Sequence, residues 1–134
     1  MIQAPPYALS IPVFRLKALA SHAGRAALGG DREIALACFA VARLALGMLP
    51  PFLLTPADAA TRIANTKQWL SSLSLPVSAR SACIAVADAV ASANRRATVH
   101  AISGLIEACA RNLDQASIAE LHELMAELDG KARA

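Results

Sequence analysis

Five polar side chains that could take part in acid–base chemistry recur at helical spacing between residues 96 and 111. They are Arg96, His100, Ser103, Glu107 and Arg111. A histidine among acidic and basic groups could transfer protons. At helical periodicity, however, these positions lie on the side opposite to the apolar stripe of the same segment. We therefore predict a solvent-exposed face with surface ion pairs to Glu107, and no catalytic residues.

A second polar group, near the C-terminus, has the residue types of a metal site. It consists of Glu120, His122, Glu123 and Glu127. A di-iron bundle requires Glu-x-x-His pairs from two helices, with both side chains facing inward. His122 follows Glu120 by only two residues, which places the two side chains on different faces of a helix. We predict no metal site here.

The three cysteines, Cys38, Cys83 and Cys109, are far apart in the sequence and have apolar neighbours. No Cys-x-x-Cys pair or zinc-ligand spacing is present, so we expect buried thiols in a reducing compartment. Residues 29–32, Gly-Gly-Asp-Arg, could bind an anion at a helix start, but no strand or further glycines accompany them. We interpret them as a helix stop followed by an N-cap, and we expect no cofactor.

Nucleic-acid binding is an alternative suggested by Arg95-Arg96, by the nearby Arg80 and by a pI of about 9.1. The net charge is only +3. The exposed positions that would follow on a recognition helix, His100, Ser103 and Arg111, are few. The sequence favours a protein partner over nucleic acid or a membrane.

The charge distribution points to one candidate partner surface. Residues 1–113 carry eleven Lys and Arg against five Asp and Glu, whereas residues 114–134 carry two against five. An acidic amphipathic helix on a basic body could pack on its own domain or dock on another chain. We predict that its acidic edge, Glu120, Glu123 and Glu127, binds a partner, with the basic residues Arg95 and Arg96 as the second choice.

Alanine occupies 32 of the 134 positions, and residues that favour strands are scarce. This composition predicts an all-α fold. The run from Ile34 to Leu54 contains a single charge, Arg43, and long apolar runs can span membranes. Pro50-Pro51 and the central arginine argue for a buried helix instead.

Prolines, glycines and helix-capping residues along the chain predict five to six helices in one domain over 13–130. A Pro-rich arm at residues 1–12 precedes this domain, and a disordered tail at 131–134 follows it. Four of the expected helices cover 13–28, 32–49 (with Asp31 as N-cap), 56–73 and 98–112. Another helix starts near 78, before the one at 98–112, and the last helix ends at Gly130. Starts near 13, 56 and 98 suggest three stacked α-hairpins as an alternative. We expect a bundle with the second helix at its centre.

Two helix starts have competing interpretations. The apolar stripe of the fourth helix shifts phase within residues 94–98, which predicts a turn there, with one continuous helix as the alternative. Ser117 to Glu120 fits a capping box, while Asp114 is a competing N-cap.

These observations predict a non-catalytic, helical protein–protein interaction module, an adaptor or assembly subunit, in the cytoplasm. Small residues along the fourth helix (Ala82, Ala85, Ala89 and Ala93) and the apolar fraction of 56% favour a homo-oligomer, most simply a dimer. The alternatives are a small nucleic-acid-binding protein and a bundle that binds a small apolar ligand near Trp69 and Phe52.

Overall fold

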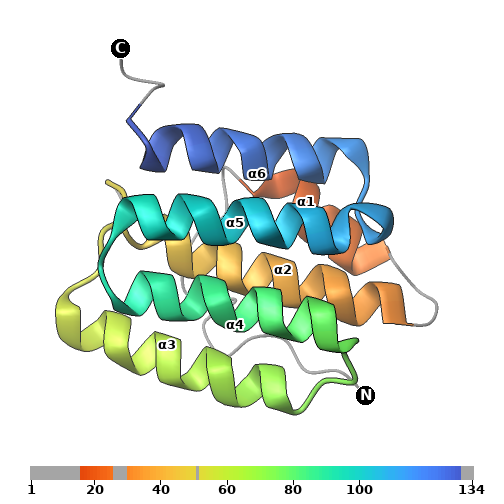
Figure 1. Ribbon diagram of the computed structural model, residues 1–134, viewed down its shortest axis with the longest axis horizontal. Coiled ribbons are helices and arrows are strands. Elements are labelled where there is room, and N and C mark those ends of the chain that lie inside the picture. The colour runs from red at the N-terminus through yellow and green to blue at the C-terminus, as the bar shows by residue number, and fades with distance from the viewer. Residues whose placement is uncertain (1–15, 26–29, 51, 131–134) are drawn as a thin grey trace.

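The computed structural model describes residues 16–25, 30–50 and 52–130, which form six α-helices and one short 3-10 helix (Figure 1). The elements are α1 (Lys17–Arg25), α2 (Gly30–Leu46), α3 (Pro56–Ser71), α4 (Val77–Ala91), α5 (Arg95–Cys109), η1 (Ala110–Asn112) and α6 (Gln115–Leu128). The described ranges contain no strand, so the all-α prediction is confirmed. The expected arm at 1–12, the start of the first helix at 13 and the tail at 131–134 lie outside these ranges.

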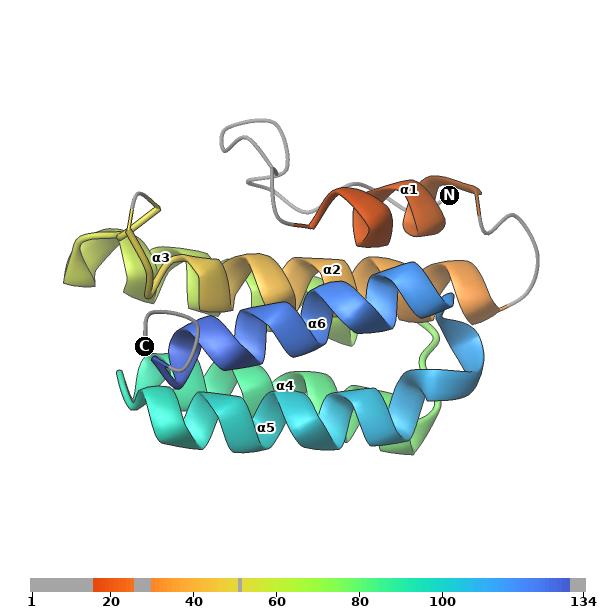
Figure 2. The ribbon, with the colours of Figure 1, turned by 90° about the horizontal axis from the view of Figure 1, so that it is seen from above.

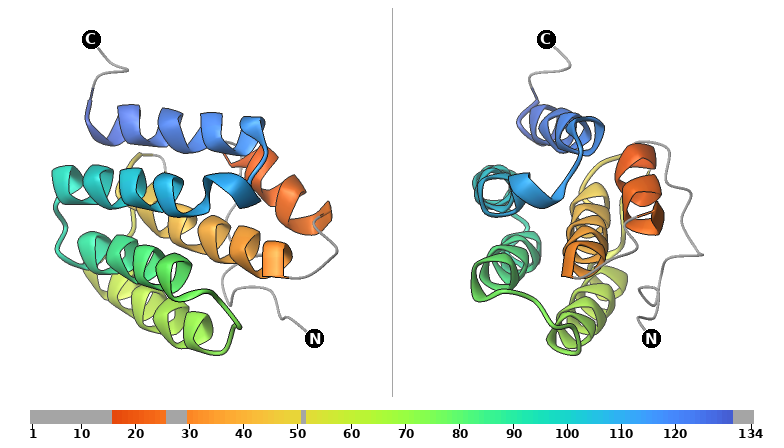
Figure 3. Two further views of the ribbon diagram at one scale, coloured as in Figure 1. Left: turned by 45° about the vertical axis from the view of Figure 1, so that its right-hand side comes forward. Right: turned by 90° about the vertical axis from the view of Figure 1, so that its right-hand side faces the viewer.

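Helix α2 lies at the centre of the bundle, as predicted. Seen along the helices, it is surrounded by α1, α3, α4, α5 and α6 (Figure 3). Its alanines at 35, 37, 40, 42 and 45 are fully buried, which lets neighbouring helices approach closely. Arg43 is also buried, and its guanidinium carbon lies 5.5 Å from the centroid of the Phe39 ring. Of the helices in the described ranges, none combines the length and the apolar character needed to cross a membrane.

The first and last helices contact each other, which closes the bundle around α2 (Figure 2). The backbone N–H of Leu19 donates to Oε1 of Glu120 at 2.9 Å, and Arg25 donates to Asp114 at 3.3 Å. In a linear stack of hairpins, each unit contacts only its neighbours along the chain. The contact between α1 and α6 therefore makes this a closed bundle, and not an open stack of three hairpins.

A turn separates α4 from α5, so the continuous-helix alternative is wrong. Ala93 has a positive φ of 56°, and Asn94 caps α5 by accepting the Ala97 N–H at 3.0 Å. The turn lies a few residues earlier than we predicted. Helix α5 begins at Arg95 and not at Thr98, because the Asn94 side chain stabilises an N-terminus at that point.

Three other predicted boundaries need correction. Helix α2 begins at Gly30, so Asp31 lies within its first turn and accepts a hydrogen bond from Asn112 at 2.7 Å. The same helix ends at Leu46, before a turn over residues 47–50, and not at residue 49. In α6 the N-cap is Asp114, which accepts the Ser117 N–H at 2.8 Å, so the capping box from Ser117 is wrong.

Candidate functional site

The two polar groups that could have been catalytic or metal-binding do not form a site. All five residues of the first group, 96, 100, 103, 107 and 111, are exposed, as predicted for a solvated face. In the second group, His122 and Glu123 are exposed, whereas Glu120 and Glu127 are half-buried. Within the described part of the chain, no group of three or more His, Cys, Asp or Glu side chains could hold a metal ion.

The predicted acidic edge is partly engaged within the chain. The carboxylate of Glu120 accepts the backbone N–H of Leu19. This N–H belongs to the first turn of α1, where backbone donors have no acceptor within the helix. Glu123 is the exposed member of the set Glu120, Glu123 and Glu127. Intramolecular packing of α6, the other interpretation of this helix, is therefore observed, while a partner-binding role for its edge stays a prediction.

The two adjacent arginines have different surroundings. A guanidinium N–H of Arg95 donates to the backbone carbonyl of Met48 at 3.1 Å, which brings this side chain to the end of α2. Arg96 is exposed at the start of α5 and does not line the pocket described below. Of the pair that the sequence joined as one basic surface, Arg95 and not Arg96 therefore borders the pocket.

The three cysteines meet in the core, which their separation in the sequence did not reveal. Cys38 on α2, Cys83 on α4 and Cys109 on α5 are all fully buried and unpaired, as expected for buried thiols. The pKa of Cys38 is raised well above that of an ordinary thiol, because the thiols of Cys109 and Cys83 form hydrogen bonds with it and burial disfavours the thiolate. All three thiols are inaccessible, and an inaccessible thiol is a poor nucleophile, so we interpret the cluster as core packing.

An apolar pocket of about 600 Å³ opens at the end of the bundle where α2 and α4 end and α3 begins. Its volume is within the range of about 300–1,000 Å³ that is typical of small-molecule sites. The lining residues come from α2, the following loop, α3, α4 and the start of α5. They are Leu44, Gly47, Met48, Leu53, Leu54, Pro56, Ala59, Ala60, Ile63, Ala64, Lys67, Val90, Ala91, Ala93 and Arg95.

Small side chains on α3 leave room for this pocket. Ala59, Ala60 and Ala64 recur at helical spacing and face the ends of α2 and α4. Longer side chains at these positions would fill the space. The same residue type that allows close packing around α2 thus forms a hollow beside α3.

The loop between α2 and α3 supplies the rest of the wall. After Leu46 the chain tightens into a turn, in which Gly47 donates to the carbonyl of Leu44 at 3.0 Å. The N–H of Leu54 then donates a hydrogen bond to the carbonyl of Gly47 at 3.1 Å. Thr55 caps α3 by accepting the Asp58 N–H at 3.1 Å, as its Thr-Pro sequence predicts. These bonds hold Leu53 and Leu54 at the pocket.

Two cations, Lys67 and Arg95, are the charged residues among those that line the pocket. The ammonium of Lys67 lies 2.7 Å from Oδ1 of Asp88, whose own side chain is outside the lining. Among residues 16–25, 30–50 and 52–130, Arg95 has no carboxylate partner. The pocket therefore joins an apolar interior to a positively charged border.

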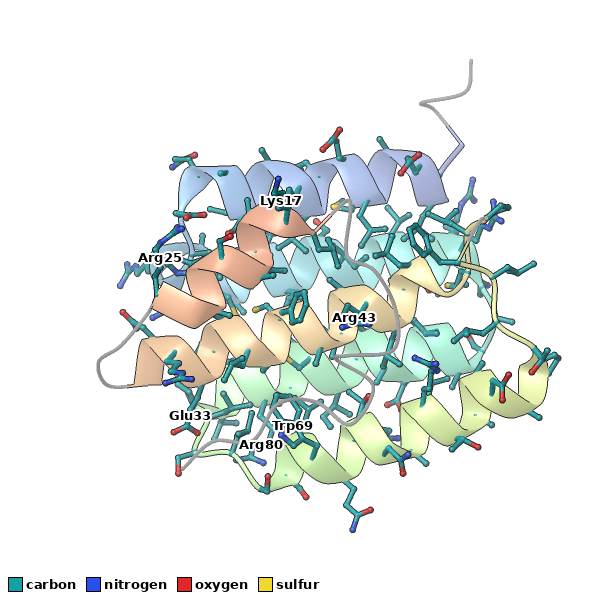
Figure 4. All side chains as sticks on the ribbon, turned by 180° about the vertical axis from the view of Figure 1, so that it is seen from behind. Lys17, Arg25, Glu33, Arg43, Trp69 and Arg80 are labelled. Carbon is teal, nitrogen blue, oxygen red and sulfur yellow. The ribbon has the colours of Figure 1, made fainter. Side chains whose placement is uncertain are left out.

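A ligand pocket was expected near Trp69 and Phe52, and these two residues are not among those that line this pocket. Both side chains are half-buried against the core. Trp69 lies beside Arg80 near the C-terminal end of α3 (Figure 4). No signal in the sequence located the pocket, because alanine-rich faces also pack closely, as they do around α2.

No protein-family model matches this chain, and no curated protein or solved structure is significantly similar to it.

Proposed function

We propose that this protein is a non-catalytic binding module that holds a small apolar ligand in the pocket between α2, α3 and α4. The observation that carries the proposal is the apolar pocket of about 600 Å³, which has small side chains on one wall. Burial of apolar ligand surface there supplies about 25 cal/mol for each Å² removed from water. A cavity of this kind is a common form of ligand site.

The lining favours binding over chemistry. Its titratable side chains are two cations, Lys67 and Arg95, and the described lining includes no Asp, Glu, His, Cys, Ser or Thr. Lys67 is already paired with Asp88. General acid–base or covalent catalysis requires a base or a nucleophile within hydrogen-bond reach of the reacting group. The described lining residues provide attraction and orientation instead.

Titration with Nile red, a neutral dye whose fluorescence rises in apolar surroundings, tests this function. We expect saturable binding to the wild-type protein and loss of most of this binding in Ala60→Phe, because Ala60 is exposed on α3 and lines the pocket. Ala119→Phe is the matched control, since Ala119 is exposed on α6 and lies outside the pocket. Equal binding by all three proteins, with unchanged circular dichroism, would refute the proposal.

A protein-interaction role for the acidic edge of α6 is the second candidate. The exposed carboxylate of Glu123 and the half-buried Glu127 support it. Reversing both to lysine should weaken capture of a basic partner, whereas Glu107→Lys, an exposed glutamate on α5, should not. Equal capture of the same partners from native lysate by both variants would remove this candidate.

Self-association and a cytoplasmic location also belong to this proposal. Of the small residues expected along the fourth helix, Ala85 is exposed on α4, which supports a second copy packing there, whereas Ala93 lies in the turn after the helix. Light scattering after gel filtration would show a mass above 13.9 kDa if this is correct. The three unpaired cysteines support a reducing compartment.

A further inference from the structure

We propose that the ligand is a single-chain amphiphile with an anionic head, such as a fatty carboxylate. This inference rests on the proposed function and adds the chemistry of the ligand. The alkyl chain would lie against the alanines of α3 and the leucines of the loop, and the carboxylate would face Lys67 and Arg95. The ligand class follows from two observations, the apolar lining and the sign of the charges that border it.

The apolar part of the pocket suits an unbranched chain. One wall is formed by Ala60 and Ala64, the opposite wall by Leu44 and Val90, and the loop contributes Leu54. Side chains on these walls offer no hydrogen-bond donor or acceptor. The polar groups of a polar ligand would be buried there without hydrogen-bond partners, which costs free energy. A hydrocarbon chain has no polar groups and avoids this cost.

The charged part of the border is asymmetric. Lys67 is largely compensated, because its ammonium lies 2.7 Å from Oδ1 of Asp88. Arg95 donates one N–H to the carbonyl of Met48 and has no carboxylate partner in the described ranges. A guanidinium group carries five N–H donors in a fixed planar arrangement, so several remain for a ligand. Arg95 is therefore the main contact that we assign to the anionic head.

The geometry also defines which ligands should bind less well. A neutral alcohol of the same length would keep the apolar contacts but lose the charge-assisted hydrogen bonds to Arg95. A quaternary ammonium amphiphile would be repelled by Arg95 and Lys67. The pocket should therefore rank three amphiphiles of similar chain length by the charge of the head alone.

Displacement of Nile red by decanoate, decanol and decyltrimethylammonium, each below its micelle concentration at neutral pH, tests this ranking. In the wild-type protein, decanoate should bind most tightly and decyltrimethylammonium least tightly. Arg95→Gln should weaken decanoate binding by about two- to fivefold, the range for one exposed charge pair, and leave decanol unchanged. Arg96→Gln is the matched control, because it removes the same charge from an exposed position outside the pocket.

Asp88→Asn provides a test with the opposite sign. It releases Lys67 from its ion pair and removes a negative charge near the border. Decanoate should therefore bind about two- to fivefold more tightly to this variant. A variant that merely disturbs the fold would weaken all three amphiphiles together, so a selective gain for decanoate identifies the head-group contact.

The outcomes separate this inference from the proposed function. If decanoate and decanol bind equally and both are excluded by Ala60→Phe, the pocket binds apolar ligands and the anionic-head assignment is wrong. If Nile red and all three amphiphiles fail to bind, both proposals are wrong. Equal effects of Arg95→Gln and Arg96→Gln would also overturn the assignment, since a general loss of positive charge would then explain them.

Discussion

Replacement of Asp114 by alanine should remove three contacts, two of which join α1 to the start of α6. Its carboxylate accepts the Ser117 N–H at 2.8 Å and a guanidinium N–H of Arg25 at 3.3 Å, and Nδ1 of His22 lies 3.5 Å away. The residue thus caps α6 and at the same time attaches α1 to it. This contact region consists of Asp114, Ser117, Arg25 and His22.

The cost of Asp114→Ala can be estimated from its parts. Loss of an aspartate N-cap costs about 0.5–2 kcal/mol. Each exposed ion pair adds about 0–1 kcal/mol, and the Arg25 side chain is 67% exposed, which favours the lower end. We expect a decrease of about 1–3 kcal/mol in the free energy of unfolding. Asp114→Asn keeps a good cap and should cost only about 0.5–1 kcal/mol, because asparagine caps helices as well as aspartate does.

The effect should depend on pH in one direction. The pKa of Asp114 is lowered, first because the hydroxyl and the backbone N–H of Ser117 lie beside its carboxylate, and also because His22 and Arg25 are nearby. The unfolded-state pKa is therefore the higher one. Stabilisation by the charge is complete above the unfolded-state pKa and is lost as the pH falls through the folded-state pKa. The difference in stability between wild type and Asp114→Asn should shrink on acidification.

Urea unfolding followed by far-UV circular dichroism, at neutral pH and in steps down to acid pH, measures these differences. The midpoint should shift with little change in the denaturant slope. A double-mutant cycle with Arg25→Ala isolates the ion pair. If Asp114→Asn costs as much as Asp114→Ala, the capping estimate is wrong. If the difference between wild type and Asp114→Asn does not change with pH, the charge contributes nothing and the assignment of this contact region fails.

Three further predictions concern the pocket, the end of α3 and the core. Gly47→Ala should cost about 1–3 kcal/mol in urea unfolding and weaken Nile red binding, because the added Cβ would lie 2.9 Å from Cδ1 of Leu54 at the pocket wall. Arg80→Met should lower stability by about 1–2 kcal/mol in scanning calorimetry, because the guanidinium donates to two carbonyls at the end of α3, at 3.2 and 2.7 Å. The three cysteines should not react with a thiol reagent in the native protein and should all react on unfolding, because each is fully buried; rapid labelling of the native protein would contradict this.

Local signals in the sequence were sufficient where the determinant of structure was also local. Thr55-Pro56 starts α3 at the predicted residue, because a Thr side chain and a Pro at the first helical position act within one turn. The phase shift near residue 94 located the turn before α5 to within a few residues. The all-α fold and the central position of α2 followed from composition and from an apolar run with one charge.

The helix starts that we predicted incorrectly depended on hydrogen-bond partners far away in the sequence. Asp31 was expected to cap α2, but its carboxylate accepts a hydrogen bond from Asn112, 81 residues away. Glu120 was expected in a capping box, but it accepts the N–H of Leu19. Side chains of this type can serve either local or distant donors, and only the tertiary arrangement decides between them.

The candidate site was hidden from the sequence for a related reason. Its walls come from four helices and a loop, so the pocket exists only after α2, α3 and α4 have taken their places. Nothing in the pattern of α3 distinguishes a face that packs closely from a face that borders a hollow, since both are rich in alanine. In the same way, the convergence of the three cysteines requires the crossing of α2, α4 and α5.

Alanine has two opposite consequences in this protein, and the difference explains where a ligand site could form. In α2, small side chains are surrounded by helices on several sides, so neighbouring backbones come closer and the space is filled. Helix α3 lies at the edge of the bundle, and its N-terminal half faces the C-terminal ends of α2 and α4 instead of a full helix. At α3, no neighbouring helix in the described part of the chain comes closer to fill the space that the small side chains leave empty. A bundle of this composition should therefore be rigid at its centre and hollow at the end of an outer helix, which is where the pocket lies.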